Sequence, residues 1–372
     1  MQKIQVAVLD IGSSKITAVV GERGINKTFV IKGEKSFPFE GFCVGEIYDE
    51  NGFKTALISC AEFIKKTSRT SPLRVYVGVP SAFTSVFVKE SQISFAKKKK
   101  ITDSDVDALF DSAFVIQSTK QTLINRSAIV YELDDYRRLA NPIGSNSEIL
   151  KGKLSFVLCQ NCFIDLVRSA LKVGGIMDVE FVSMALCEAM YLIDAEVRDR
   201  IAEILDVGYI TTTFSIVQGD GIIYQKTFDY GGGFITADLT RKLGTTFDLA
   251  DEIKKKINLS KLSVNAFDVI EGENGEMFNA MDVNDCVLSS LDNLCENISL
   301  AIENSGYVVP EYVPLMITGG GISFIRGAKE HISKRLGCSV EVVAPKLPMH
   351  ESPIKSSTFS LLDLALMQNG QA

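Results

Sequence analysis

Two aspartates with similar neighbours are the residues best suited to bind a charged ligand. Asp10 and Asp206 each end a short apolar segment, and each is followed two positions later by a glycine and then by hydroxyl-bearing residues. Glycine permits a tight turn there, so the carboxylate, the backbone amides and the hydroxyls come close together. Such a group of polar atoms is typical of a site for an anion and magnesium.

The two copies of this pattern span Val8–Thr17 and Ile204–Thr213. The residues after each glycine are short and β-branched, which favours a strand, so each aspartate is predicted to stand in a β-hairpin. A Walker loop or a Rossmann motif would need a helix after its glycines, and neither motif occurs. The simplest interpretation is two similarly folded halves that present one hairpin each to the same ligand.

The residues that follow Asp10 fit phosphate groups. Ser13 and Ser14, with their amides, would contact phosphates from one side, and the ammonium of Lys15 would add a point charge. The triplet Gly319–Gly321 follows an apolar strand and lets the backbone approach a ligand closely. The alternative, two unrelated turns with capping aspartates, is disfavoured by the repeat and by the glycine triplets.

A second group of charges lies on a predicted helix. Asp251, Lys254 and Lys255 are spaced i, i+3 and i+4, so they share one helix face, which suits a ribose and an adenine but also an ordinary surface ion pair. Asp10 and Asp206 are expected to hold magnesium through its waters, and no catalytic residue is predicted. The predicted cofactor-binding residues are Asp10, Gly12, Ser13, Ser14, Lys15, Asp206, Gly208, Thr211, Thr212, Gly231, Gly232, Asp251, Lys254, Lys255, Gly319, Gly320 and Gly321.

The composition indicates a cytoplasmic globular protein of two to four subdomains. The chain has 372 residues, of which 46% are hydrophobic and 23% charged. Its net charge of −7 argues against nucleic acid as a partner. The N-terminus lacks the apolar run of a signal peptide, and no stretch approaches the roughly 18 apolar residues of a membrane span. The eight cysteines are expected to be reduced thiols, and the pair Cys159 and Cys162 predicts no metal site.

The character of the sequence changes after Pro80 and predicts an inserted α+β subdomain. Short strands are expected around Ser85–Phe95, a helix over Asp103–Gln117 and a strand over Leu154–Cys159. Four lysines at 97–100 are interpreted as a solvated edge, although a neighbouring subunit or an anionic membrane would also suit them.

Helices and strands alternate in the remainder of the chain. The segment Asn258–Asp285 is expected to contain loops. Helices are predicted over Phe53–Thr67, Asn161–Val173, Ser183–Ala195, Thr236–Leu243, Phe247–Ile257, Val287–Asn304 and Thr358–Met367, and strands over Val75–Val79, Ile222–Phe228 and Val313–Thr318.

The order of these motifs resembles the actin, Hsp70 and sugar-kinase superfamily of ATP-binding proteins. The resemblance rests on the two aspartate hairpins, Gly231–Gly232, Ala250–Lys254 and Gly319–Gly321. Within this superfamily, the chain is similar to the bacterial cell-division family FtsA. The segments that carry this likeness are Leu9–Lys15, Gly45–Asp49, Ile235–Leu239 and the insertion with its turn Asn141–Gly144.

The resemblance implies an α/β, actin-like fold of two lobes with an FtsA-type inserted subdomain. It also implies a protein that binds ATP with magnesium, polymerises and links FtsZ filaments to the inner face of the cell membrane at the division septum. The subdomain at 251–312 would receive the FtsZ tail. The implied parts are 1–80 with 161–185 and 355–372 for the first lobe, 81–160 for the insertion, 186–250 with 313–354 for the second lobe, and 251–312 for the small subdomain.

Four departures from the family pattern modify this expectation. Tyr209 and Ile210 stand where the family has glycines and Thr213 replaces an acid, so phosphate binding is expected to be weakened and ATP hydrolysis to be slow at most. Asp251 is one methylene shorter than the usual glutamate. No amphipathic helix follows the last predicted helix, so membrane contact is expected to be indirect or weak. The arginine by which the family contacts FtsZ has no counterpart between Val287 and Asn304.

Two other functions remain compatible with the sequence. A small-molecule kinase of the same superfamily would need a general base near the substrate hydroxyl, and no aspartate after Gly208 is placed to serve. An actin-like scaffold of pilus assembly would need no such residue.

Overall fold

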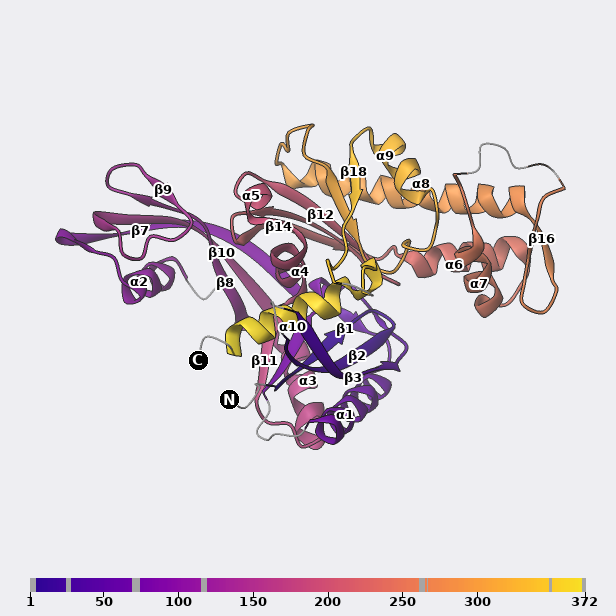
Figure 1. Ribbon diagram of the computed structural model, residues 1–372, viewed down its shortest axis with the longest axis horizontal. Helices are drawn as coiled ribbons and strands as arrows, with labels where there is room; N and C mark the ends of the chain where they lie inside the picture. Colours follow the sequence, from indigo (N-terminus) through magenta and orange to yellow (C-terminus); the bar gives the residue numbers. More distant parts are fainter. Residues whose placement is uncertain are drawn as a thin grey trace.

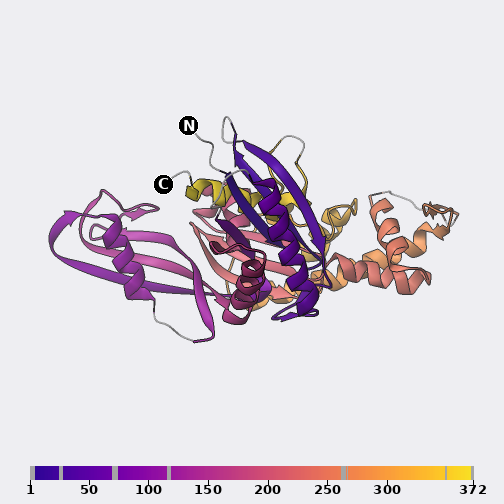
Figure 2. The same cartoon turned by 90° about the horizontal axis from the view of Figure 1, so that it is seen from below.

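The computed structural model describes residues 5–24, 28–68, 74–114, 119–260, 265, 267–347 and 350–369. Two lobes, each built on a five-stranded sheet, lie side by side, and one extension projects from each end of the molecule (Figures 1 and 2). Across these residues, no helix is both long enough and apolar enough to cross a membrane.

The sheet of the first lobe has the strand order β11-β6-β1-β2-β3. Strands β1, β2 and β3 form an antiparallel meander. Strand β6 pairs in parallel with β1, and β11 pairs in parallel with β6. These strands are β1 (Gln5–Ile11), β2 (Lys15–Arg23), β3 (Phe29–Pro38), β6 (Val75–Val79) and β11 (Val179–Ser183).

The sheet of the second lobe repeats this topology in the order β14-β13-β12-β17-β18. The registers match as well, because Asp10 lies opposite Thr17 on β2, and Asp206 lies opposite Thr213 on β13. The predicted pair of hairpins is therefore confirmed. These strands are β12 (Ala202–Val207), β13 (Thr212–Gln218), β14 (Gly221–Phe228), β17 (Leu315–Thr318) and β18 (Val340–Val342).

Successive residues of β1 point to opposite faces of the first sheet, and each face has its own helices. Ala7 and Leu9 pack with α1 (Glu50–Thr67) and α3 (Asn161–Val173). Val6 and Val8 pack with α4 and α10. The bounds of these last two helices are Met184–Leu192 and Ser356–Asn369.

Helix α4 lies between the two lobes. Its residues Met184 and Cys187 belong to the core under the first sheet, whereas Ala189 and Leu192 pack with Ile204 of the second. The predicted helix over Ser183–Ala195 is thus shorter than expected: Ser183 caps it, and a separate α5 (Ala195–Arg198) follows.

The insertion forms a sheet of order β7-β10-β8-β9 covered by α2 (Asp103–Ala113). The prediction of short strands was wrong, because β7 runs unbroken through the lysine run and keeps its pairing with β10 by means of a bulge. The end of the predicted helix near Gln117 lies outside the described residues. The strands are β7 (Thr84–Lys100), β8 (Gln121–Leu133), β9 (Arg138–Leu139) and β10 (Asn146–Gln160).

The insertion rests on the edge of the second lobe. Ser155 Oγ donates to the carbonyl of Ile222 at 2.6 Å, and the amide of Asp220 donates to the carbonyl of Ala128 at 3.2 Å. These bonds connect the insertion to β14 and to the turn before it.

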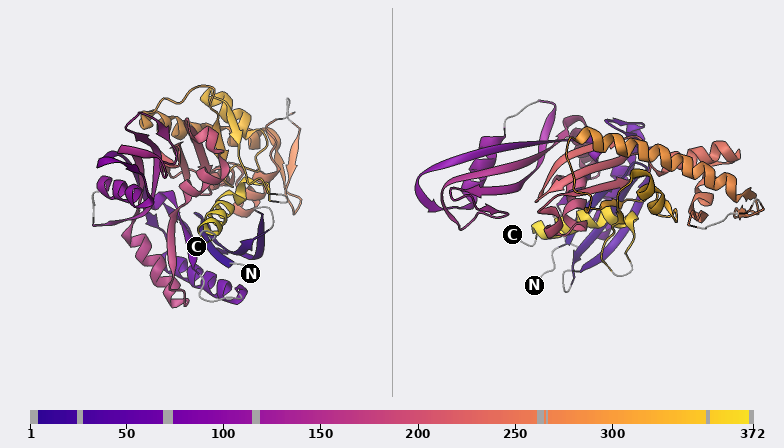
Figure 3. Two further views of the ribbon diagram at one scale, coloured as in Figure 1. Left: turned by 60° about the vertical axis from the view of Figure 1, so that its left-hand side comes forward. Right: turned by 90° about the horizontal axis from the view of Figure 1, so that it is seen from above.

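The opposite extension, which we call the small subdomain, contains α6, α7, the hairpin β15-β16 and one end of α8 (Figures 1 and 3). The segment Asn258–Asp285, which was expected to contain loops, has turns but also holds this hairpin and the first turn of α8. The start of α8 is fixed by Asn279, which accepts from the amides of Met281 and Asp282. The bounds are α6 (Gly232–Leu243), α7 (Phe247–Lys256), β15 (Val269–Glu271), β16 (Met277–Asn279), α8 (Ala280–Ser305) and, in the second lobe, α9 (Ala328–Leu336).

The core of the second lobe contains a buried acid, Glu203. Glu203 lies on β12 between Ile216 and Leu315, with 8% of its surface exposed. Burial raises the pKa of Glu203 to about 7. The folded protein therefore holds a proton that the unfolded chain loses near pH 4.5, and stability falls as the pH rises from there to 7.

We expect Glu203→Gln to raise the free energy of unfolding at pH 8 by about 2–3 kcal/mol, with no gain at pH 4. Urea unfolding at both pH values measures the difference. Glu341→Gln, at an exposed position of β18, is the control and should change neither value. An equal effect of Glu203→Gln at both pH values would contradict the raised pKa of Glu203.

Candidate functional site

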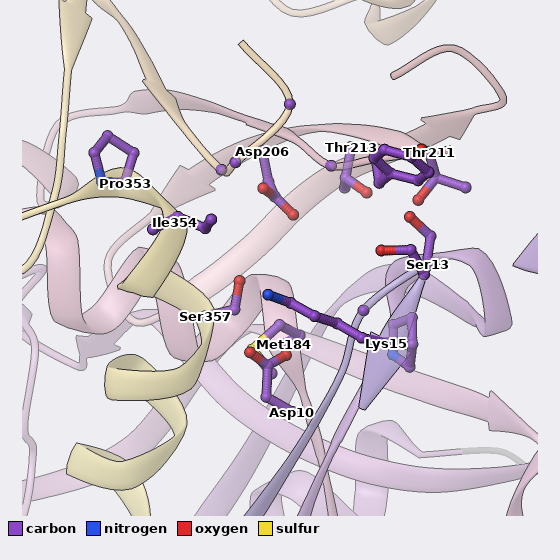
Figure 4. Close-up of a pocket in the computed structure, with 18 of the residues that line it drawn as sticks. Asp10, Ser13, Lys15, Met184, Asp206, Thr211, Thr213, Pro353, Ile354 and Ser357 are labelled. Atoms are coloured by element: carbon purple, nitrogen blue, oxygen red, sulfur yellow. The ribbon is translucent and has the colours of Figure 1, made fainter. Parts of the chain in front are cut away.

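A cavity of about 420 Å³ lies between the two lobes (Figure 4). It collects residues from β1, β12, α4, α7, the loop after β17 and the start of α10. Most of the predicted cofactor-binding residues line it, namely Asp10, Gly12, Ser13, Ser14, Lys15, Asp206, Gly208, Thr211, Asp251, Lys254, Lys255, Gly319, Gly320 and Gly321.

The two hairpin turns are built alike. The amide of Gly12 donates to the carbonyl of Lys15 at 3.0 Å, and the amide of Gly208 donates to the carbonyl of Thr211 at 3.0 Å. Each bond closes a turn that leaves the preceding aspartate at the cavity. Asp10 and Asp206 therefore enter the cavity from opposite lobes (Figure 4).

The two turns also contact each other. The amide of Ile210 donates to Ser13 Oγ at 2.9 Å, which joins the second lobe to the first. The side chain of Ile210 lies against Gly41, where an added Cβ would stand 2.6 Å from its Cδ1. Ile210 is not among the lining residues, so its side chain does not narrow the cavity, whereas Tyr209 does line it.

The loop after β17 forms the opposite wall without side chains. Gly319 has a φ of 93°, and a Cβ there would stand 2.3 Å from Asp206 Oδ1. The amide of Gly321 donates to the carbonyl of Val207 at 2.7 Å. Glycine is required here both by the backbone conformation and by the nearness of the carboxylate.

Three of the predicted cofactor-binding residues lie outside the cavity lining. Thr212 donates from Oγ1 to the carbonyl of Tyr230 at 2.6 Å. Gly231 and Gly232 lie under the second turn, and the amide of Gly232 donates to the carbonyl of Gly208 at 2.9 Å. These residues support the turn and dock α6 against it.

The charged residues of α7 form more than a surface ion pair. Asp251 accepts from Lys254 Nζ at 2.8 Å and from Lys255 Nζ at 2.6 Å. Lys254 is buried and also donates to the carbonyl of Gly232 at 3.0 Å and to Thr236 Oγ1 at 2.7 Å. Burial lowers the pKa of Lys254, and its bonds tie α7 to the start of α6.

Three acids with raised pKa values line the cavity. Burial raises the pKa of Asp206 to about 7, with the nearby Asp10 adding to the shift. Burial also raises the pKa of Asp10 and, more strongly, that of Glu188 on α4. The side chain of Lys15 extends into the space between Asp10 and Asp206 (Figure 4).

The donor set fits a hydrated magnesium ion and phosphate groups. Within the described part of the chain, no three His, Cys, Asp or Glu side chains gather closely enough to ligate one metal ion directly. Magnesium does not need three protein ligands, because it keeps several waters and is bound through only one or two carboxylates beside phosphate oxygens. The ammonium of Lys15 and the bare backbone at Gly319–Gly321 suit the phosphates.

Sequence reasoning missed several lining residues that come from distant segments. One signal was available: Glu188 is an acid inside a helix that is otherwise apolar on all sides, and such an acid is seldom buried without a function. The start of α10 gave no comparable signal. The missed residues include Phe42, Pro80, Ser81, Met184, Ala185, Glu188, Phe324, Pro353, Ile354 and Ser357.

Comparison with known proteins supports the interpretation of the fold. The family model for cell division protein FtsA matches residues 204–361. The FtsA of Neisseria meningitidis serogroup B is 21% identical over 359 residues, which is 93% of this chain and 85% of that protein. The FtsA of Pseudomonas aeruginosa is 21% identical over 380 residues, which is 97% of this chain and 89% of that protein.

The chain is therefore similar to the FtsA family, as the order of its motifs predicts. Solved structures agree on the fold. A type IV pilus biogenesis complex of PilM and PilN aligns with a TM-score of 0.65 at 17% identity and covers 98% of this chain and 99% of the other. MreB5 of Spiroplasma citri bound to AMPPNP aligns with a TM-score of 0.57 at 13% identity. The alignment covers 100% of this chain and 99% of the MreB5 chain. The chain thus has the predicted α/β, actin-like fold.

The close packing of Gly319 against Asp206 can be tested with Gly337 as a matched control. Gly319→Ala places a Cβ against Asp206 in a backbone conformation that favours glycine, whereas Gly337 shares a positive φ but has open space around its Cβ. We expect Gly337→Ala to cost about 1 kcal/mol of stability and Gly319→Ala at least about 2 kcal/mol more. Thermal unfolding of both variants measures this, and equal losses would contradict the close packing at Asp206.

Proposed function

We propose that this protein is a divergent member of the FtsA family that binds ATP with magnesium between its lobes, polymerises, and links FtsZ filaments to the inner face of the cell membrane at the division septum. The observation that carries the proposal is the cavity in which the hairpins of Asp10 and Asp206 meet. In a chain with the actin-like fold, that is the place where both lobes can contact one ligand. The structure of MreB5 bound to AMPPNP supports the choice of a nucleotide.

Each part of the cavity would contact a different part of the ligand. Ser14 and Lys15 would bind phosphates, and Asp10 and Asp206 would accept hydrogen bonds from the waters of magnesium. The charged face of α7 would lie near the ribose. Magnesium, when bound, would neutralise part of the phosphate charge.

The proposal includes ATP hydrolysis only as a slow reaction. Tyr209 lines the cavity where the resemblance implies a glycine, and its side chain limits the approach of backbone amides to a phosphate. The nucleotide would then act mainly as a switch between lobe arrangements, since a ligand held by both lobes favours the arrangement that it fits best.

The surface of the small subdomain suits a protein partner. Val269, Met277 and Met281 are 51%, 62% and 43% exposed, and Phe267 nearby is 93% exposed. Exposed apolar side chains gathered at one place mark protein interaction sites. We assign this subdomain to the FtsZ tail, the insertion to polymer contacts, and membrane contact to a partner or to a weak direct interaction.

An actin-like scaffold of pilus assembly is the second candidate function. It is favoured by the alignment with the PilM–PilN pilus complex, which covers 98% of this chain. The same fold and cavity would serve there, but the partner would be a pilus protein.

Partner binding decides between the two functions. We expect the purified protein to sediment with ATP and magnesium and to bind a peptide of the FtsZ C-terminal tail, measured by fluorescence anisotropy. Failure of both would contradict the division role, and binding of a PilN peptide in place of the FtsZ peptide would establish the second candidate.

The nucleotide part is tested by a single substitution. Asp10→Ala should weaken ATP binding in magnesium at least about tenfold, because a water-mediated contact to the cation is lost. Asp165→Ala, at an exposed position of α3, is the matched control. Equal nucleotide affinity of both variants would mean that the hairpins are only structural.

A further inference from the structure

Glu188 is a buried acid that the proposed contacts to the ligand do not use. It is 3% exposed and lies on α4, between Cys187 in the core under the first sheet and Ala189 in the core under the second. It also lines the cavity that holds Asp10 and Asp206. Its place on a helix between the lobes brings a third carboxylate to the strand ends.

The start of α10 fixes the carboxylates on one side of the cavity. Ser357 Oγ donates to Glu188 Oε1 at 2.6 Å, and Thr358 Oγ1 donates to Asp10 Oδ2 at 2.6 Å. The preceding residue, Ser356, shares a hydrogen bond of 2.6 Å with the hydroxyl of Thr318 on β17. Three consecutive hydroxyls thus connect α10 to both lobes and hold two of the acids in place.

The charges in this part of the cavity do not balance. Three acids line this part of the cavity, and Lys15 acts on only one of them, Asp10. Lys355 also acts on Asp10 but is paired with Glu34, and Lys254 and Lys255 are both paired with Asp251. Burying an uncompensated carboxylate is costly. A divalent cation beside these carboxylates would remove the excess negative charge, and it would do so at the position where the phosphates also need a positive ion.

A purely structural role would place Glu188 as a favourable charge at the N-terminal end of α10. That role explains the bond from Ser357. It does not require the cavity, and it makes the affinity for magnesium independent of Glu188. The two roles therefore differ in a measurable quantity.

We propose that Glu188 is a third carboxylate that holds the hydration shell of the magnesium ion bound with the nucleotide, and that Ser357 is its positioning residue. This inference rests on the proposed nucleotide site. Asp10 and Asp206 hold the waters from the two strand ends, and Glu188 holds them from α4.

The test is a magnesium titration of nucleotide binding. A fluorescent ATP analogue is bound to wild type and to Glu188→Gln at increasing magnesium, and the half-saturating magnesium concentration is read from anisotropy. We expect Glu188→Gln to raise this concentration about tenfold or more and Ser357→Ala to raise it less. Binding of the analogue in EDTA should be unchanged or stronger, because a negative charge has been removed. Glu296→Gln, at an exposed position of α8, should match wild type.

The outcomes separate this inference from the proposed function. If wild type binds the analogue neither with magnesium nor in EDTA, the proposed function fails. If wild type responds to magnesium and Glu188→Gln responds at the same concentration, the proposed function stands and this inference is overturned. Should Glu188→Gln not fold, Ser357→Ala decides alone, and an unchanged magnesium midpoint overturns the inference.

Discussion

Buried negative charge at the boundary between two lobes is the constraint on which the rest of this structure depends. Asp10 and Asp206 end equivalent strands and face the same cavity, where Lys15 extends between them. Such charges are tolerated only where hydrogen bonds, cations or ligands compensate them. The glycine turns, the bare wall at Gly319–Gly321 and the hydroxyls of α10 are arranged to serve these two carboxylates.

The same arrangement explains how a ligand could change the shape of the molecule. The lobes are joined at the cavity by the bond between Ile210 and Ser13, by α4 and by the first turn of α10. The insertion rests on the second lobe, and α8 extends from that lobe into the small subdomain. A ligand that draws Asp10 and Asp206 together would therefore move the small subdomain relative to the first lobe, to which the insertion is joined through β6 and α3. Interfaces made by the small subdomain would respond to the nucleotide.

The sequence contained enough local information to predict the hairpins, the turn glycines and about half of the cavity lining. Asp10 and Gly12 lie in one short motif, and the geometry of its turn depends only on residues that are neighbours in the sequence. Glu188 and Ser357 could not be joined by such reasoning, because their contact depends on the packing of α10 against α4 across 169 positions of chain. The hairpin β15-β16 was missed for another reason: polar, glycine-containing segments resemble loops until a neighbouring helix covers one face.

The central claim is that the cavity between the lobes is a magnesium-dependent nucleotide site. Isothermal titration calorimetry of ATP into the purified protein, with magnesium and then with EDTA, tests it most directly. The account predicts saturable binding of one ATP per chain with magnesium and weakening of about tenfold or more when magnesium is removed. Absence of binding in both conditions, or identical affinity with and without magnesium, would contradict it.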